Sequence, residues 1–152
     1  MTIRRKNPSV QGSAKILIPV GELVSKKLIT QALHVLSVFK KPLIVLFSVI
    51  EVPSRTATLE RDPYRKQIIE AENRLSGLST WLADQGLKVL VKVVVARNIA
   101  EGIIDETESD GYLLVFMMKR KTHRGWRSIF SRSVSQKVVR AANCFVLTAP
   151  LE

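Results

Sequence analysis

The sequence predicts an α/β fold, a three-layer, doubly wound sheet of five parallel strands with helices on both faces. Short apolar runs rich in β-branched residues alternate regularly along the chain with longer stretches of helical spacing. The short runs are also almost continuously apolar, which is typical of parallel strands covered on both faces. Because strands that alternate with helices are joined by right-handed crossovers, the order implies a parallel sheet.

Five segments are expected to form the strands. They cover residues 14–20, 42–50, 88–96, 112–118 and 144–148. Lys88 and Lys92 interrupt the third segment, so its pattern alternates more than that of the others. Lysines at such positions discourage pairing with a further strand, so this segment is expected at an edge of the sheet.

The first two helices are expected between these strands, at residues 28–39 and from residue 62 onward. Asp62 is expected to cap the second helix, with Pro63 at its first position and Gly86 just beyond its end. The apolar stripe of the first helix consists of Leu28, Ile29, Ala32, Leu33, Leu36 and Phe39.

The third and fourth helices begin with recognisable capping residues. Asn98 is expected to cap the third helix, with Glu101 three residues later and Gly111 closing it. The run from Ser133 to Gln136 is a capping-box pattern for a fourth helix that reaches about Ala142.

Length and composition predict one folded domain. The chain has 152 residues, and its hydrophobic fraction of 46% excludes a disordered protein. Residues 14–152 are expected to form the domain, and residues 1–13 a flexible basic leader without a secretion signal. The longest apolar stretch is broken by Lys40, Lys41 and Pro42, so no membrane span is expected. The single Cys144 fits a reducing compartment, and we expect a cytoplasmic protein.

The net charge of +11 comes mainly from one segment. Residues 119–140 contain eight basic side chains and no acidic one. Such a concentration suggests an anionic partner, which could be a phosphate compound, a nucleic acid or a membrane surface. A solvated loop and helix face explains the charge equally well.

The end of this basic loop combines a helix start with hydroxyl and cationic side chains. Free N–H groups at a helix N-terminus attract anions, and Ser133 and Ser135 add hydroxyl donors. Lys119, Arg127 and Arg132 could add charge-assisted hydrogen bonds to a phosphate. The alternative is that Ser133 only caps the helix and that the cations are solvated.

The chain resembles the universal stress protein family over residues 14–149. The resemblance rests on residues 15–20 as the first strand, on the helix start from Ser133 to Ser135, and on residues 138–147 as the last helix and strand. It implies an adenine nucleotide alpha hydrolase-like, Rossmann-like fold with strand order 3-2-1-4-5. It also implies a regulatory role in a stress response.

The resemblance places a nucleotide cleft on specific residues, but the glycines of that cleft are missing. ATP-binding members carry a glycine, two residues, a glycine, nine residues and then glycine followed by Ser or Thr. When the final position is laid on Ser133, the three glycine positions fall on Lys119, Thr122 and Arg132. Glycine lets the backbone approach phosphates closely, so these side chains are expected to obstruct the cleft. The implied cleft residues are Val20, Gly21, Val49, Lys119, Thr122, Arg132, Ser133 and Val134.

Three functions therefore remain open for the basic segment. The favoured one is a regulatory domain with a degenerate cleft that does not bind ATP tightly, so that no cofactor is expected. An alternative is a module that senses ATP or another phosphate ligand through residues 119–133. The least favoured is nonspecific nucleic-acid binding, because Trp126 alone is no stacking platform.

We expect no enzyme and no metal site. No nucleophile lies in a recognisable set with a base, and His34, His123 and Cys144 have no metal-ligand spacing. Four acidic residues crowd the end of the third helix, where they are expected to be solvated or to pair with another subunit. These residues are Asp105, Glu106, Glu108 and Asp110.

The family resemblance also implies a homodimer through the last strand. Residues from Cys144 to Thr148 carry no charge. If left unpaired, such a strand is a poorly protected edge, so pairing with a second copy of the chain is expected.

Overall fold

The computed structural model describes residues 13–21, 26–120 and 132–151, and in it five parallel strands form one sheet in the order β3-β2-β1-β4-β5. The parallel fold predicted from the sequence pattern and the strand order implied by the family resemblance are both confirmed. The elements are β1 (Lys15–Pro19), α1 (Lys26–Leu36), β2 (Leu43–Glu51), the 3₁₀ turn η1 (Asp62–Tyr64), α2 (Arg65–Asp84), β3 (Lys88–Ala96), α3 (Ile99–Ser109), β4 (Leu114–Arg120), α4 (Arg132–Ala141) and β5 (Phe145–Leu151).

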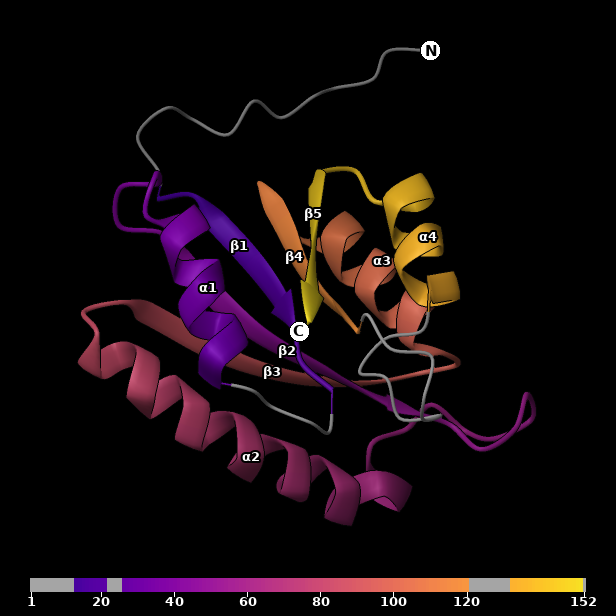
Figure 1. Cartoon of the computed structure of the whole chain (residues 1–152). Coiled ribbons are helices and arrows are strands. Elements are labelled where there is room, and N and C mark those ends of the chain that lie inside the picture. The colour runs from indigo at the N-terminus through magenta and orange to yellow at the C-terminus, as the bar shows by residue number, and fades with distance from the viewer. Residues whose placement is uncertain (1–12, 22–25, 121–131, 152) are drawn as a thin grey trace.

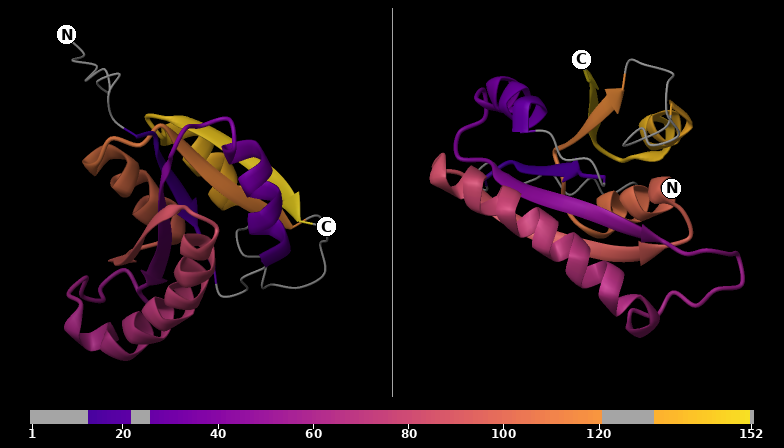
Figure 2. Two further views of the ribbon diagram at one scale, coloured as in Figure 1. Left: turned by 90° about the vertical axis from the view of Figure 1, so that its left-hand side faces the viewer. Right: turned by 60° about the horizontal axis from the view of Figure 1, so that its bottom comes forward.

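Helices cover both faces of the sheet, with α1 and α2 on one side and α3 and α4 on the other (Figures 1 and 2). Each pair encloses its own apolar cluster against the strands. In β2, Ile44 and Leu46 face the α1/α2 cluster, whereas Val45 and Phe47 face the α3/α4 cluster. All four side chains are at most 2% exposed, which explains why this strand is continuously apolar in sequence. Among the described residues, none of the helices is both long and apolar enough to span a bilayer.

Helix ends agree with the sequence in two places. The Asn98 Oδ1 atom accepts a hydrogen bond of 2.9 Å from the backbone N–H of Glu101, as expected for the cap of α3. Gly86 follows α2 with a positive φ of 84°, a conformation that glycine adopts without strain.

The expected caps of the other two helices are not found as predicted. Asp62 does not cap α2, because it lies inside the tighter turn η1, and the residue before α2 is Tyr64. Pro63 suits this turn, since proline fixes φ and its missing N–H is not needed there. The helix α4 already begins at Arg132, so Ser133 lies in its first turn instead of before it.

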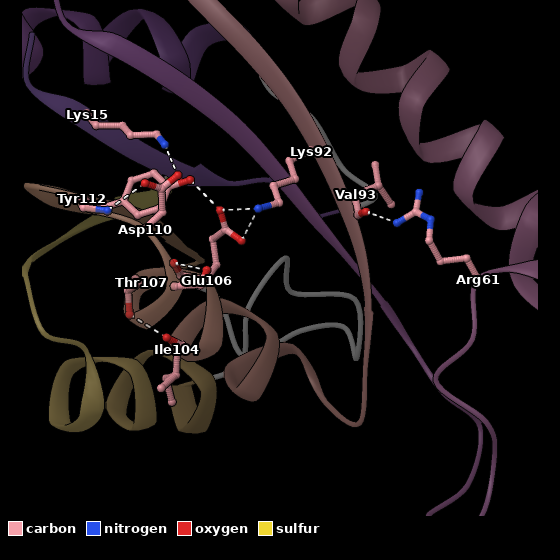
Figure 3. Close-up of polar contacts among 11 residues, drawn as sticks. Lys15, Arg61, Lys92, Val93, Ile104, Glu106, Thr107, Asp110 and Tyr112 are labelled. Carbon is pink, nitrogen blue, oxygen red and sulfur yellow. Dashed lines mark hydrogen bonds and ion pairs between the residues drawn. The ribbon is translucent and has the colours of Figure 1, made fainter.

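A side chain from the connection between β2 and α2 covers part of the outer edge of β3. The Ala96 carbonyl accepts a bond of 3.1 Å from the N–H of Val52 and so points toward β2. Backbone groups alternate in direction along a strand, so the Val93 carbonyl, three residues earlier, points away from β2. Arg61 donates from Nη1 to this Val93 carbonyl at 2.7 Å (Figure 3). The guanidinium group therefore occupies a position that another strand would need.

The opposite edge, formed by β5, carries no such protection among its described side chains. Phe145 is 74% exposed at its start, and residues 145–149 are uncharged. By contrast, Lys88 and Lys92 are exposed on β3. The strand order confirms the expected edge position of β3. The two edges of the sheet thus differ in how they resist pairing with a further strand.

Candidate functional site

The carboxyl end of β1 places two of the expected cleft residues. Val20 follows the strand directly, is 2% exposed, and donates its N–H to the Phe47 carbonyl at 2.7 Å. Gly21 comes next and is half-buried. Pro19 pairs with Phe47, so Val49 lies two residues beyond the last paired position of β1. Val20, Gly21 and Val49 therefore lie at the same end of the sheet.

The sheet order makes this end the expected position for a ligand. The chain leaves β1 for α1 on one face and enters β4 from α3 on the other, so the winding direction changes between these neighbouring strands. In open α/β sheets, ligands bind beyond the carboxyl ends of the strands at such a switch point. Leu17 pairs with Val115, so Lys119 lies past the end of β1, where it pairs with Pro150 of β5.

The first turn of α4 completes this region. Because α4 follows β4 and precedes β5, Arg132 and Ser133 begin the helix on the carboxyl side of β4. Val134 is half-buried and packs against the same α3/α4 cluster as Val49. The expected cleft residue Thr122 lies outside the described residues, as does the rest of the segment 121–131. The roles assigned to these cleft residues remain predictions.

Close packing of α3 fixes the position of Val49. A Cβ atom added at Gly102 would lie 2.8 Å and 2.9 Å from the two γ-carbons of Val49. It would also lie 3.2 Å from the Cβ of Ala96. Glycine at this position therefore lets α3 pack closely against β2 at Val49, which belongs to the expected cleft.

A polar cluster around the buried Glu106 joins α3 to the sheet, and the sequence patterns did not predict it. Glu106 is 5% exposed. The Nζ atom of Lys92, from β3, lies 2.9 Å from the Glu106 Oε1 atom and 2.7 Å from its Oε2 atom (Figure 3). The Tyr112 hydroxyl donates a further bond of 2.7 Å to Oε1. The carboxylate therefore has both an opposite charge and a neutral donor, which a buried charge requires.

The cluster continues to the first strand. Lys15 forms an ion pair with Asp110, and its Nζ atom lies 4.9 Å from the centre of the Tyr112 ring. The hydrogen bond from Lys15 is the main cause that holds the pKa of Asp110 below its ordinary value. Two of the four acidic residues at the end of α3 are thus tied to the sheet of their own subunit. The expectation that this whole group is solvated or pairs with another subunit is wrong for Glu106, which is buried. Asp110 is exposed, as expected, but it pairs with Lys15 of its own subunit.

The polar cluster lies away from the candidate ligand site, which indicates a structural role. Lys15 begins β1 and Tyr112 precedes β4, so both lie at the amino ends of these strands, opposite the candidate ligand site. Helical spacing could have revealed the buried position of Glu106, because this residue follows the buried Ile103 by three residues and faces the sheet with it.

Within residues 13–21, 26–120 and 132–151, no group of three or more His, Cys, Asp or Glu side chains could hold a metal ion.

Tyr112 gives the cluster a testable dependence on pH. Burial, followed by the bond to Glu106, raises the pKa of Tyr112 above its ordinary value of about 10. The unfolded chain therefore ionises first, and the stability due to Tyr112 is present below about pH 10 and declines above it. We expect the difference in unfolding free energy between the parent and Tyr112→Phe to narrow between about pH 9 and pH 11. Urea titrations across this range measure it, and a constant difference would contradict the assignment.

Comparison with solved structures shows the same fold in other proteins. The hypothetical protein MJ0577 matches with a TM-score of 0.71 and 22% identity, over 92% of this chain and 97% of that chain. A universal stress protein from Archaeoglobus fulgidus matches with a TM-score of 0.64 and 17% identity, over 89% of this chain and 92% of that one. A structure of the universal stress protein from the same organism in complex with dAMP matches with a TM-score of 0.54 and 16% identity, over 89% and 96% of the two chains.

Family membership is shown by sequence. A comparison with curated proteins finds no match. The family model of the Universal stress protein family, however, matches residues 13–150. Because this match spans almost the whole chain and the strand order agrees with it, the chain belongs to the universal stress protein family.

Proposed function

We propose that this stress-response domain is a non-catalytic regulatory module that forms a homodimer through β5 and does not bind ATP tightly. The observation that carries the proposal is the contrast between the two sheet edges. Arg61 and two exposed lysines protect β3, whereas β5 presents Phe145 at 74% exposure and an uncharged strand. An unprotected apolar edge in a stable protein is best explained by a partner that covers it.

The proposal of weak ATP binding rests on side-chain volume in the expected phosphate loop. When the family pattern is laid on Ser133, its three glycine positions fall on Lys119, Thr122 and Arg132. A glycine loop binds phosphates through backbone N–H groups at close range, and side chains at these positions keep the phosphates further away. The regulatory activity would then depend on protein contacts instead of a bound nucleotide. A cytoplasmic location is part of the same proposal and rests on the single cysteine.

Phe145→Lys is expected to convert the dimer to a monomer. The side chain is exposed in the single subunit, so lysine there does not disturb the fold, but it places two charges in the paired edge. Val146 is less suitable, because it is partly buried against the α3/α4 cluster. Light scattering coupled to size exclusion measures the mass. Leu90→Lys is the matched control, because Leu90 is 53% exposed on the protected edge, and it should leave the dimer intact. A dimer that survives Phe145→Lys would contradict the proposal.

Calorimetric titration with ATP and Mg²⁺, with AMP as the reference ligand, tests the cleft. We expect no saturable binding that discriminates ATP from AMP.

The dAMP complex of a structurally similar relative supports the alternative of a phosphate-ligand sensor, for which Lys119, Arg132 and Ser133 would bind the anion. Saturable ATP binding that Arg132→Glu abolishes would establish that alternative. Binding to any polyanion, falling steeply with salt, would instead indicate nonspecific nucleic-acid binding.

A further inference from the structure

We propose a specific register for the β5 dimer, in which the two-fold axis passes beside Leu147. In this register Leu147 faces the partner's Leu147, and Phe145 packs on the partner's Ala149. The inference rests on the proposed dimer and adds to it which residues meet. It follows from the backbone of β5, from one proline and from side-chain size.

The direction of the backbone groups shows which residues can bond to a second copy. The Phe145 N–H donates to the Leu113 carbonyl of β4 at 3.2 Å. Because these groups alternate along a strand, those of Leu147 and Ala149 also point toward β4. The groups of the intervening residues, Val146 and Thr148, point to the open edge.

Pro150 limits the possible registers. It shares the outward direction of Val146 and Thr148, but proline has no N–H to donate. If the axis passed beside Thr148, Pro150 would stand opposite the partner's Val146. The carbonyl of that valine would then have no N–H donor, although it lies inside the ladder. An axis beside Val146 avoids this but pairs only residues 145–147 of each strand.

The axis beside Leu147 is the longest register that keeps Pro150 outside the paired part of β5. Residues 145–149 of the two copies then face one another, and Val146 bonds with the partner's Thr148 on each side of the axis. Pro150 stands opposite the partner's Cys144, which precedes the strand. The carbonyl that faces the missing N–H then belongs to the partner's Cys144, beyond the end of the paired strands, where water can donate to it.

The side chains on one face are complementary in this register. Leu147 and Ala149 pack partly against the α1/α2 cluster, and Phe145 has the same direction by alternation. The largest side chain, Phe145, then meets the smallest, Ala149, once on each side of the axis. This arrangement covers Phe145, which is 74% exposed in the single subunit. The surface is self-complementary, which a two-fold interface requires.

Cysteine cross-linking in a Cys144→Ser background tests the register. In Leu147→Cys, the two Cα atoms would be about 4.5 Å apart, within the range for a disulfide. In Thr148→Cys, the two positions are offset by about 7 Å along the strands and also point to the other face, so no bond should form. We expect the cross-linked fraction after mild oxidation to be at least tenfold higher for Leu147→Cys, as seen on non-reducing gels.

A second variant and the parent separate the possible failures. The double variant Phe145→Cys/Ala149→Cys should also cross-link, and it serves if Leu147→Cys weakens the fold. If the Cys144→Ser parent is a monomer by light scattering, the proposed dimer itself fails. If the parent is a dimer but neither variant cross-links, or Thr148→Cys does so instead, the dimer stands and the register is wrong.

Discussion

Lys92→Met is expected to lower the free energy of unfolding by about 2 kcal/mol, because it leaves the buried Glu106 carboxylate without its cation. The Tyr112 hydroxyl would remain as a donor to this carboxylate. Breaking a fully buried pair costs about 3–5 kcal/mol, but the Lys92 side chain is 46% exposed, so water reaches the site and reduces the loss. Urea unfolding at neutral pH measures the change.

The two partners of this ion pair should respond unequally. Glu106→Gln keeps an oxygen that accepts from Tyr112, and the freed Lys92 can turn to water, so we expect a loss below about 1 kcal/mol. Lys88→Met is the matched control, since this exposed lysine lies on the same strand and face, and it should stay within about 0.5 kcal/mol. If Lys92→Met and Glu106→Gln lowered the free energy of unfolding equally, the unpaired buried carboxylate would not be the cause of the destabilisation.

The same cluster shows what sequence patterns can and cannot predict. The strands were predictable because apolar continuity is a local property, and the edge position of β3 followed from Lys88 and Lys92. The pairing of Lys92 with Glu106 was not predictable from charge alone, because the two residues meet only after α3 folds back over the sheet. Charge suggested a solvated group, although Glu106 follows the buried Ile103 by three residues and so lies on the same face of the helix.

Only part of the candidate site was predictable from the sequence. The ends of β1 and β2 lie together because parallel strands end at one edge, so the grouping of Val20, Gly21 and Val49 follows from strand order. The role of Gly102 did not follow from the sequence. A glycine inside a helix usually weakens it, and only the distance to Val49 shows why this one is needed.

Gly102→Ala is expected to destabilise the protein by about 1–2 kcal/mol, although alanine is the better helix former. Both γ-carbons of Val49 lie under 3.0 Å from the new Cβ, so rotating this stiff, β-branched side chain does not remove the clash. Either α3 or the end of β2 must therefore move. Because Val49 belongs to the expected cleft, the same displacement would reach the candidate ligand site.

Gly77→Ala provides the opposite expectation from the same chemical change. Gly77 lies in α2, and a Cβ added there meets no atom within 4 Å. The alanine should therefore only improve helix propensity, which raises the free energy of unfolding by about 0.5–1 kcal/mol. The two variants should thus differ by about 2 kcal/mol in urea unfolding, because one adds a clash and both add helix propensity. If Gly102→Ala instead stabilises the protein as Gly77→Ala does, α3 does not pack against Val49 as closely as these distances require.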